Sequence, residues 1–307
     1  MILAVCLSPC IDVNIEVDSL CVGKSQTLIS KRVFFTGKAL NVAIGIARLK
    51  ADAFATGFMY DGNGGQFERE LHREGVPYKF VWNEGRVREN YKFIDHRSML
   101  TEVNDVSAAI SAQKQQELVA LVKQLSQKCD AVVISGSLAK GMTPDYYGKV
   151  LDAIPNEVKK VVDTEGERLY CSLKRGVDLI KPNLEELERT INKKIQSKED
   201  ALAACDQLIN LGAKRVLLSL GKSGALITDG KDRYFCKSVN VAMNSTLGAG
   251  DGMVAAATNA LAKEMPLHEI LRCGVAAGTA AVTSPDCISF AKSKYEEILA
   301  TLSVKEI

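Results

Sequence analysis

NSTLGAGDG, at residues 244–252, joins a turn almost without side chains to a carboxylate directly before a helix-forming segment at 253–262. The first N–H groups of a helix lack intrahelical acceptors and carry the positive end of the helix dipole. Glycines allow a phosphoryl group to approach such a backbone closely. The stretch therefore predicts an anion site at a helix start, beside which Asp251 accepts a proton from an attacking hydroxyl. A tight turn followed by a helix-capping aspartate is the competing interpretation of the motif taken alone.

The chain has 307 residues, more than a single core usually holds, so we expect a large α/β domain with an appendage, or two domains. Its apolar content of 47%, charged content of 25% and net charge of +2 are typical of a soluble globular protein. Nucleic acid and membrane are therefore not expected as partners, and no run approaches the roughly 18 apolar residues of a membrane span. Nine cysteines, without a Cys-x-x-Cys pair or a convincing secretory leader, favour a cytoplasmic location.

Buried-strand patterns alternate with helix-period segments, as in a mainly parallel sheet that helices cover on both faces. The expected strands are the apolar runs at 2–7, 53–58, 131–135, 158–162, 177–180 and 215–220. The expected helices lie at 39–50, 67–74, 114–127, 144–153, 184–191 and 198–211, and the chain from 251 onward is mostly helical. No long linker or repeat separates these segments, so the domains are expected to interleave.

Two segments depart from this alternation of strands and helices and predict a small sheet that stands off the main domain. Residues 11–17 alternate strictly between apolar and polar side chains, which indicates a half-buried antiparallel strand. Residues 78–103 contain a second such region with a period of two. The polar faces of the two segments carry Asp12, Asn14, Arg88, Asn90 and Lys92. These side chains either face a substrate beneath the sheet or form the solvated outer face of an edge strand.

A second helix start carries a glycine and a lysine. The segment TGKALNVA at residues 36–43 places Lys38 and Asn41, three residues apart, on one face of the expected helix. The helix dipole disfavours a cation at this end unless an anion is bound there. The segment therefore predicts a site for a phosphate or a polyol, and a lysine that extends into solvent is the alternative.

Six short motifs follow one another along the chain: GKALNVA, SGSLAKG, DTEG, KPNLEE, SLGKSG and GAGD, which begin at residues 37, 135, 163, 181, 219 and 248. Through them the sequence resembles, from end to end, the PfkB-type carbohydrate kinases of the ribokinase-like superfamily. It is most similar to the branch of 1-phosphofructokinases and tagatose-6-phosphate kinases. The resemblance implies a three-layer αβα sandwich with a mainly parallel sheet and a small β-sheet lid. The α/β core would then comprise residues 1–10, 36–76 and 104–307, and the lid residues 11–35 and 77–103.

The resemblance also implies an activity, the ATP-dependent phosphorylation of a phosphorylated ketohexose. Asp251 would be the general base, and Gly248, Ala249 and Gly250 would form the anion hole. The residues implied to bind the sugar are Asp12, Asn14, Gly37, Lys38, Asn41, Arg88, Asn90, Lys92 and Ser137. The cationic side chains among them suit a phosphate already present on the sugar. Two alternatives stay open: a kinase of an unphosphorylated sugar or nucleoside, and a sugar-phosphate sensor with weak turnover.

The same resemblance implies a nucleotide site beyond two of the expected strands. Its residues are Lys181, Asn183, Glu186, Ser219, Gly221 and Gly224. Glu186 is implied to hold Mg²⁺ through water, and the family leaves room for a monovalent cation and for a homodimer formed through the lid. Taken alone, Asn183 is also a helix cap and residues 219–228 a simple hairpin. Small residues at 274–278 suit either an adenine or close helix packing.

The chain departs from the family pattern at several positions that bear on sugar specificity and nucleotide affinity. They are Thr36, Ala39, Ala139, Gly252 and Val275. Other enzyme classes fit less well, because the chain has neither a Gly-x-Gly-x-x-Gly dinucleotide motif nor a P-loop. Its three histidines stand beside no nucleophile motif, which argues against a Ser-His-Asp hydrolase.

Overall fold

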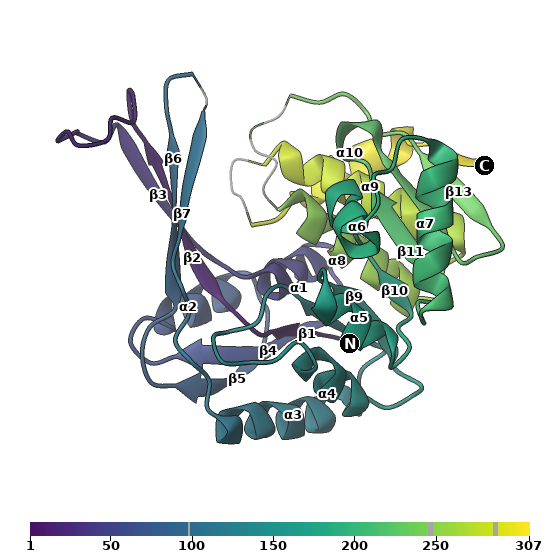
Figure 1. Cartoon of the computed structure of the whole chain (residues 1–307), viewed down its shortest axis with the longest axis horizontal. Coiled ribbons are helices and arrows are strands. Elements are labelled where there is room, and N and C mark those ends of the chain that lie inside the picture. Colours follow the sequence, from purple (N-terminus) through teal and green to yellow (C-terminus); the bar gives the residue numbers. More distant parts are fainter. Residues whose placement is uncertain (98, 243, 245–247, 285–287) are drawn as a thin grey trace.

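The computed structural model describes residues 1–97, 99–242, 244, 248–284 and 288–307. Its main sheet has ten strands in the order β14-β13-β12-β11-β10-β9-β8-β1-β4-β5, and a second sheet has four in the order β3-β2-β6-β7. Figure 1 shows the four-stranded sheet projecting from the main body. We call this second sheet the lid. The expected α/β fold with a large, mainly parallel sheet and a small lid sheet is confirmed.

The main sheet is parallel through its centre and antiparallel at one end. Adjacent strands from β5 to β11 run parallel, whereas β11, β12, β13 and β14 pair antiparallel. Central strands such as β1 and β8 are continuous apolar runs buried along their whole length, as expected for a sheet covered on both faces. The strands are β1 (Ile2–Cys6), β4 (Ala53–Tyr60), β5 (Tyr78–Asn83), β8 (Ala131–Ser135), β9 (Lys159–Asp163), β10 (Leu179–Ile180), β11 (Val216–Ser219), β12 (Ala225–Thr228), β13 (Arg233–Cys236) and β14 (Val304–Glu306).

Two groups of helices cover this sheet (Figure 1). Helices α1, α8, α9 and α10 pack one against the next and contact β1, β12 and β13, while α3, α4 and α5 form a second packed series over β4 and β9. The helices are α1 (Lys38–Arg48), α2 (Gly65–Arg73), α3 (Ala112–Ser126), α4 (Tyr146–Asp152), α5 (Glu167–Leu173), α6 (Leu184–Ile191), α7 (Lys198–Asn210), α8 (Ala249–Ala262), α9 (Leu267–Val282) and α10 (Lys292–Thr301). Within the described ranges, none of them combines the length and apolar character that crossing a bilayer would require.

The lid consists of β2 (Cys10–Glu16), β3 (Ser30–Thr36), β6 (Arg88–Ile94) and β7 (Leu100–Asn104). Strand β2 pairs antiparallel with β3 and parallel with β6, so the sheet is mixed rather than purely antiparallel. The register pairs Asp12 with Asn90 and Asn14 with Lys92, which brings the polar positions of both strands onto one face. All four of these residues except Asp12 are buried, so this face is turned inward and is not a solvated outer face.

The expected start of the second lid segment at residue 77 is wrong. Residues 78–83 form β5, which pairs in parallel with β4 at the edge of the main sheet. Helix α2 connects these two strands, and a strand, helix and strand in succession form a crossover unit whose strands pair in parallel. Phe80 and Val81, adjacent residues on opposite faces of β5, are both buried, as in a strand of the core. The lid part of this region begins only at Arg88.

Candidate active site

The carboxyl ends of the central parallel strands meet at one edge of the main sheet, where ligands bind in folds of this class. Two cavities open at this edge. The first, which we call the lid cavity, has a volume of about 170 Å³ and is lined by Ser8, Cys10, Gly37, Lys38, Arg88, Gly136, Ser137, Thr164, Glu165 and Arg168. The second, the α8 pocket, has a volume of about 420 Å³, and its lining includes Lys181, Asn183, Ser219, Gly221, Gly224, Ala249, Gly250, Val275 and Gly278.

The predicted sugar-binding and nucleotide-binding residues line different cavities. Four of the predicted sugar-binding residues line the lid cavity: Gly37, Lys38, Arg88 and Ser137. Five of the predicted nucleotide-binding residues line the α8 pocket: Lys181, Asn183, Ser219, Gly221 and Gly224. The remaining predicted residues line neither cavity; of these, Asn90 is hydrogen-bonded to Arg88 and Glu186 to Asn183, which do line one. These remaining residues are Asp12, Asn14, Asn41, Asn90, Lys92, Glu186, Gly248 and Asp251.

A hydrogen-bonded network on the inner face of the lid is centred on Asp12. Its carboxylate accepts a hydrogen bond from Asn90 Nδ2 at 3.1 Å and pairs with Lys92 Nζ at 3.0 Å. Thr36 Oγ1 donates to the same carboxylate at 3.3 Å. Arg88 Nη1 in turn donates to Asn90 Oδ1 at 3.0 Å. Asp12 thus neutralises Lys92, whereas no carboxylate of the described residues pairs with Arg88.

Asp251 lies buried in the first turn of α8. Its Oδ2 accepts a hydrogen bond of 2.8 Å from Asn41 Nδ2, which comes from α1. Burial raises the pKa of Asp251 to about 6, and the nearby Lys38 ammonium reduces the extent of the rise. The carboxyl group is thus a stronger base than an exposed aspartate, and it remains ionised at neutral pH.

A buried carboxylate, Asp163, joins the two cavities. Its Oδ2 lies 3.5 Å from Lys38 Nζ, and its Oδ1 lies 3.4 Å from Lys181 Nζ. Ser135 Oγ donates to Oδ2 at 2.8 Å. Although burial alone would raise the pKa of Asp163, the two lysines outweigh it and the pKa is lowered; Asp163 in return raises the pKa of Lys38. Asp163 therefore holds one lysine side chain at each cavity.

The N-terminus of α8 supplies backbone donors to the α8 pocket. Gly248, the N-cap residue, has the left-handed φ of 77°, and no side chain caps the helix. The first intrahelical bond runs from Gly252 N to Gly248 O, so the N–H groups of Ala249 and Gly250 have no acceptor within the helix. A Cβ atom added to Gly250 would lie 3.5 Å from Lys181 Nζ. An ammonium group and a helix N-terminus thus face the same pocket; Ser245, Thr246 and Leu247 of the opening stretch lie outside the described residues.

Several of the structural interpretations of single motifs are seen in the structure, and they leave the functional ones possible for the same residues. Asn183 caps α6, because its side chain accepts from Glu186 N and the Glu186 carboxylate accepts from Asn183 N, both at 2.8 Å. The other oxygen of that carboxylate lies 4.0 Å from Lys38 Nζ and so faces the site. One carboxylate and one amide beside the two cavities fit Mg²⁺, which retains several waters. The described residues contain no group of three or more side chains of the kind that encloses a metal.

Two glycine-rich segments also combine a structural role with a position at the α8 pocket. Residues 219–228 are a hairpin between β11 and β12, as the simpler interpretation expected, yet Gly221 and Gly224 line the pocket. A Cβ on Gly274 would lie 3.2 Å from Met253, so this glycine permits close packing of α8 and α9. Gly278 permits the same packing and also lines the pocket.

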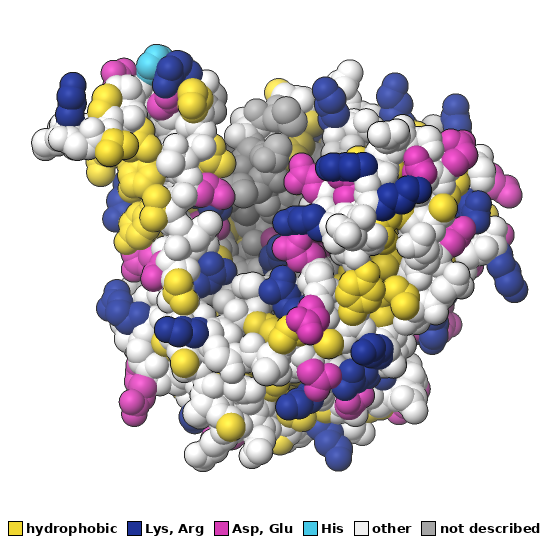
Figure 2. Space-filling model, viewed as in Figure 1, with side chains coloured by type: hydrophobic (Ala, Val, Ile, Leu, Met, Phe, Trp, Pro, Cys, Tyr) yellow, Lys and Arg dark blue, Asp and Glu magenta, His cyan; other side chains and the backbone are white. Residues whose placement is uncertain are grey.

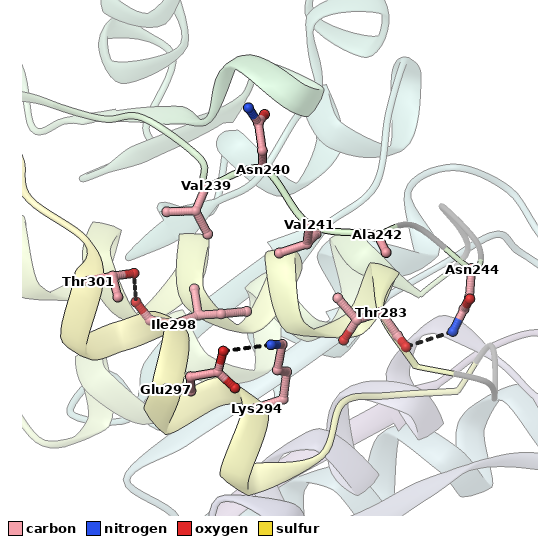
Figure 3. A pocket seen from close by; sticks show the side chains of 10 residues that line it. All are labelled: Val239, Asn240, Val241, Ala242, Asn244, Thr283, Lys294, Glu297, Ile298 and Thr301. Carbon is pink, nitrogen blue, oxygen red and sulfur yellow. Dashed lines mark hydrogen bonds and ion pairs between the residues drawn. The ribbon is translucent and has the colours of Figure 1, made fainter.

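A third cavity, of about 510 Å³, lies beside the α8 pocket and shares residues 239–241 with it (Figure 3). No predicted residue lines it. Its two charged side chains, Lys294 and Glu297, pair with each other at 2.7 Å, and Asn244 Nδ2 donates to Thr283 O. Its charged groups are thus already satisfied, and the chemistry concentrates in the other two cavities.

Sequence reasoning missed several residues of the site. Asp163 and Thr164 belong to the DTEG motif used for the resemblance, yet neither was assigned a role. Asp163 is the last residue of β9 and Thr164 the next, so both lie at the carboxyl edge of the sheet, which is a usable indication. Arg168 comes from α5, a helix that the periodicity did not predict. Ser8 precedes the lid and Cys10 is its first residue, and neither belongs to a motif.

Comparison with known proteins gives a consistent result. The model of the pfkB family of carbohydrate kinases matches residues 1–294. A 1-phosphofructokinase of Borreliella burgdorferi is 29% identical over 310 aligned residues, which cover 100% of this chain and 99% of that protein. The ATP-dependent 6-phosphofructokinase isozyme 2 of Escherichia coli is 31% identical over 271 residues, 87% of each chain. A crystal structure of phosphofructokinase-2 from Escherichia coli in complex with substrates and products is 29% identical, with a TM-score of 0.89 over 97% of this chain and 98% of that one.

The raised pKa of Asp251 predicts a stability effect. Above pH 6 the folded chain holds this carboxylate in the charged form that burial disfavours, so Asp251→Asn should increase the free energy of unfolding by up to about 3 kcal/mol at pH 8. The increase should shrink as the pH falls from 6 toward 4, because the wild-type carboxyl group then becomes protonated in the folded state. Urea unfolding of both proteins at pH 8 and pH 5 measures the difference.

Asp163→Asn is the matched control, because its pKa shift has the opposite sign. The lowered pKa means that the charged form of Asp163 stabilises the fold at all pH values above its unfolded pKa, so this variant should lose stability at pH 8. A destabilised Asp251→Asn protein at pH 8 would contradict a raised pKa of Asp251.

Proposed function

The chain belongs to the pfkB family of carbohydrate kinases, and we propose that it transfers the γ-phosphoryl group of ATP to a hydroxyl of a phosphorylated ketohexose. The family and fold expected from the sequence motifs are confirmed. Relatives named 1-phosphofructokinase and 6-phosphofructokinase support a sugar phosphate as the acceptor. Fructose 1-phosphate, fructose 6-phosphate and tagatose 6-phosphate are the candidate substrates, since they differ only in the position of the phosphate or in one stereocentre.

The observation that carries the proposal is the position of Asp251 relative to the two cavities. It is buried in the first turn of α8, whose N-terminus faces the α8 pocket, and Asn41 on α1 orients its carboxylate. In our proposal the sugar occupies the lid cavity, and Asp251 removes the proton of the attacking hydroxyl. A base whose pKa is near 6 is ionised at neutral pH and retains a useful affinity for a proton.

The migrating phosphoryl group is stabilised by fixed donors. We assign the anion hole to the backbone at Gly248–Gly250, where the helix dipole and free N–H groups favour negative charge. Lys181, held by Asp163 beside Gly250, and Lys38 at the lid cavity contribute the charges on either side of the transfer. ATP occupies the α8 pocket, and Mg²⁺ held through water by Glu186 would neutralise phosphate charge. A monovalent cation stays part of the proposal without an assigned residue.

Arg88 supports a phosphorylated acceptor over a free sugar or a nucleoside. Its Nε atom is buried and has no hydrogen-bond partner among the described residues, and no described carboxylate pairs with the guanidinium. A buried donor without an acceptor is costly, so an anionic ligand would satisfy it. The Lys92 charge, by contrast, is taken by Asp12, and we assign Lys92 the role of holding Asp12 in place. A sensor without turnover would not need the buried base.

We further propose that two copies of the chain associate through the lid. The strand register places Val33 and Val103 on the face opposite Asp12, together with Tyr91. Both valines are exposed, as are Leu28 and Ile29 nearby, and Figure 2 shows hydrophobic side chains gathered on the lid. A small sheet with an exposed apolar face is typical of an interaction site, and a second copy offers the same apolar surface.

An assay of the three candidate phosphoketoses with ATP and Mg²⁺ tests the activity, and Asp251→Asn tests the base. The variant should lower kcat by about 10²-fold or more while the KM for the sugar changes little, because the amide cannot accept the proton. The kcat/KM of the wild type should fall as the pH drops below about 6, where Asp251 becomes protonated. A variant that turns over at a near-normal rate would refute the assignment.

Arg88→Ala should raise the KM for the phosphosugar about 10-fold or more and leave the KM for ATP nearly unchanged, because the guanidinium lines only the lid cavity. Steady-state kinetics with each substrate varied in turn measures the two constants. Equal increases in both would contradict a role at the sugar phosphate.

Light scattering of the full chain should give the mass of a dimer, and Val103→Asp should give that of a monomer, because the new charge lies within the proposed contact. Leu211→Asp is the matched control, since Leu211 is also exposed but follows α7, far from the lid in the chain. A monomeric wild type, or a dimer unaffected by Val103→Asp, would exclude the lid interface.

A further inference from the structure

We propose that Arg168 is a second phosphate-binding residue of the lid cavity and acts together with Arg88 on the phosphate that the sugar already carries. The inference rests on the proposed function, and it extends that function to a residue that no motif of the sequence indicated. Arg88 enters the cavity from lid strand β6, and Arg168 enters it from α5 in the main body. The two guanidinium groups therefore reach one cavity from its two different walls.

The geometry of Arg168 leaves its terminal nitrogens free for a ligand. Its Nε donates to Thr164 Oγ1 at 2.9 Å, and that hydroxyl donates to the carbonyl of Gly136 at 3.1 Å. This chain of hydrogen bonds fixes the plane of the guanidinium through Nε alone. Among the described residues, no hydrogen bond from Nη1 or Nη2 of Arg168 is formed. The end of the guanidinium thus keeps the two parallel donors that bind a phosphate in bidentate fashion.

The charge balance of the lid cavity also favours an anionic ligand. Lys38 already has two carboxylate partners, Asp163 at 3.5 Å and Glu186 at 4.0 Å. Among the described residues, Glu165 is the one acidic side chain that lines the cavity. Its Oε2 pairs with Arg189 Nη2 at 2.8 Å, and its Oε1 makes a longer ion pair of 3.9 Å with Arg168 Nη2. The cavity therefore holds two guanidinium groups: that of Arg88 pairs with no described carboxylate, and that of Arg168 has only the long ion pair with Glu165, which Arg189 binds more closely. Two such charges match a phosphate dianion and would have no purpose toward an uncharged hydroxyl.

A merely structural role for Arg168, in which it braces the turn at Thr164, makes different predictions. Bracing would affect the folding stability, kcat and both KM values together, because the turn adjoins Asp163. Phosphate binding would affect only the constants that involve the phosphosugar. Arg189 provides a matched control: it also pairs with Glu165, but its side chain is 63% exposed and does not line the cavity.

The test measures steady-state kinetics of the full chain with the best of the three phosphoketoses and with the same ketose lacking its phosphate. Arg168→Ala should raise the KM for the phosphoketose about 10- to 100-fold, the loss expected for charge-assisted hydrogen bonds. Its kcat, its KM for ATP and its kcat/KM for the unphosphorylated ketose should stay within about twofold of the wild type. Inhibition by inorganic phosphate against the phosphoketose should weaken in the same variant, and Arg189→Ala should change none of these values.

Arg168→Lys keeps a charge and the packing of the stem, so it should show an intermediate increase in KM and should remain testable if the alanine variant unfolds. If the wild type phosphorylates no phosphoketose, the proposed function fails and the inference fails with it. If the wild type is active and both Arg168 variants keep its KM for the phosphoketose, the inference alone is overturned. Equal changes in the constants for both ketoses would likewise overturn it, because they would indicate a bracing role.

Discussion

The site depends on one buried carboxylate that two lysines share. Asp163 lies between Lys38 and Lys181, and each lysine belongs to a different cavity. Moving a charge out of water costs several kcal/mol of free energy unless an opposite charge compensates it. Here the carboxylate and the two ammonium groups compensate one another. The arrangement fixes the two ammonium groups at the two cavities where the proposed function places phosphates. It also adds to the negative charge that Asp251 experiences and so contributes, after burial, to the raised pKa of that base.

Most of the fold could be predicted from strong regularities in the sequence. Apolar runs such as residues 131–135 form buried parallel strands, and helix-period segments such as 184–191 form helices at the expected positions. Residues 78–83 were misassigned because alternating apolar side chains suit an edge strand of either sheet, and only the crossover through α2 decides between them. Helix α5, of seven residues, was not predicted, although α4 of the same length was.

The site was predictable where a motif fixes the backbone and less so where distant residues meet. Gly250 and Asn183 follow from local rules for helix starts, and their positions at the α8 pocket agree with them. The pairing of Asp163 with both lysines joins three separate motifs, and no spacing in the chain encodes such a contact. A residue such as Asn183 can both cap a helix and lie beside the candidate site, and this has a physical origin. Helices begin at the carboxyl edge of a parallel sheet, and ligands bind at the same edge in folds of this class.

Two of the connections between the lid and the main body lie side by side. Strand β1 of the main sheet continues into β2 of the lid through residues 7–9, and β3 leads through Gly37 into α1, which begins at Lys38. A Cβ on Gly37 would lie 2.8 Å from Cys6 Sγ, so the two connections pass each other in close contact. Asp12 and Arg88 therefore belong to the lid, whereas Lys38, directly after this crossing, belongs to the first turn of α1 in the main body. A lid that swung about these connections would carry the first two side chains toward or away from the third, so that closing over a sugar and bringing the charges together would be a single event.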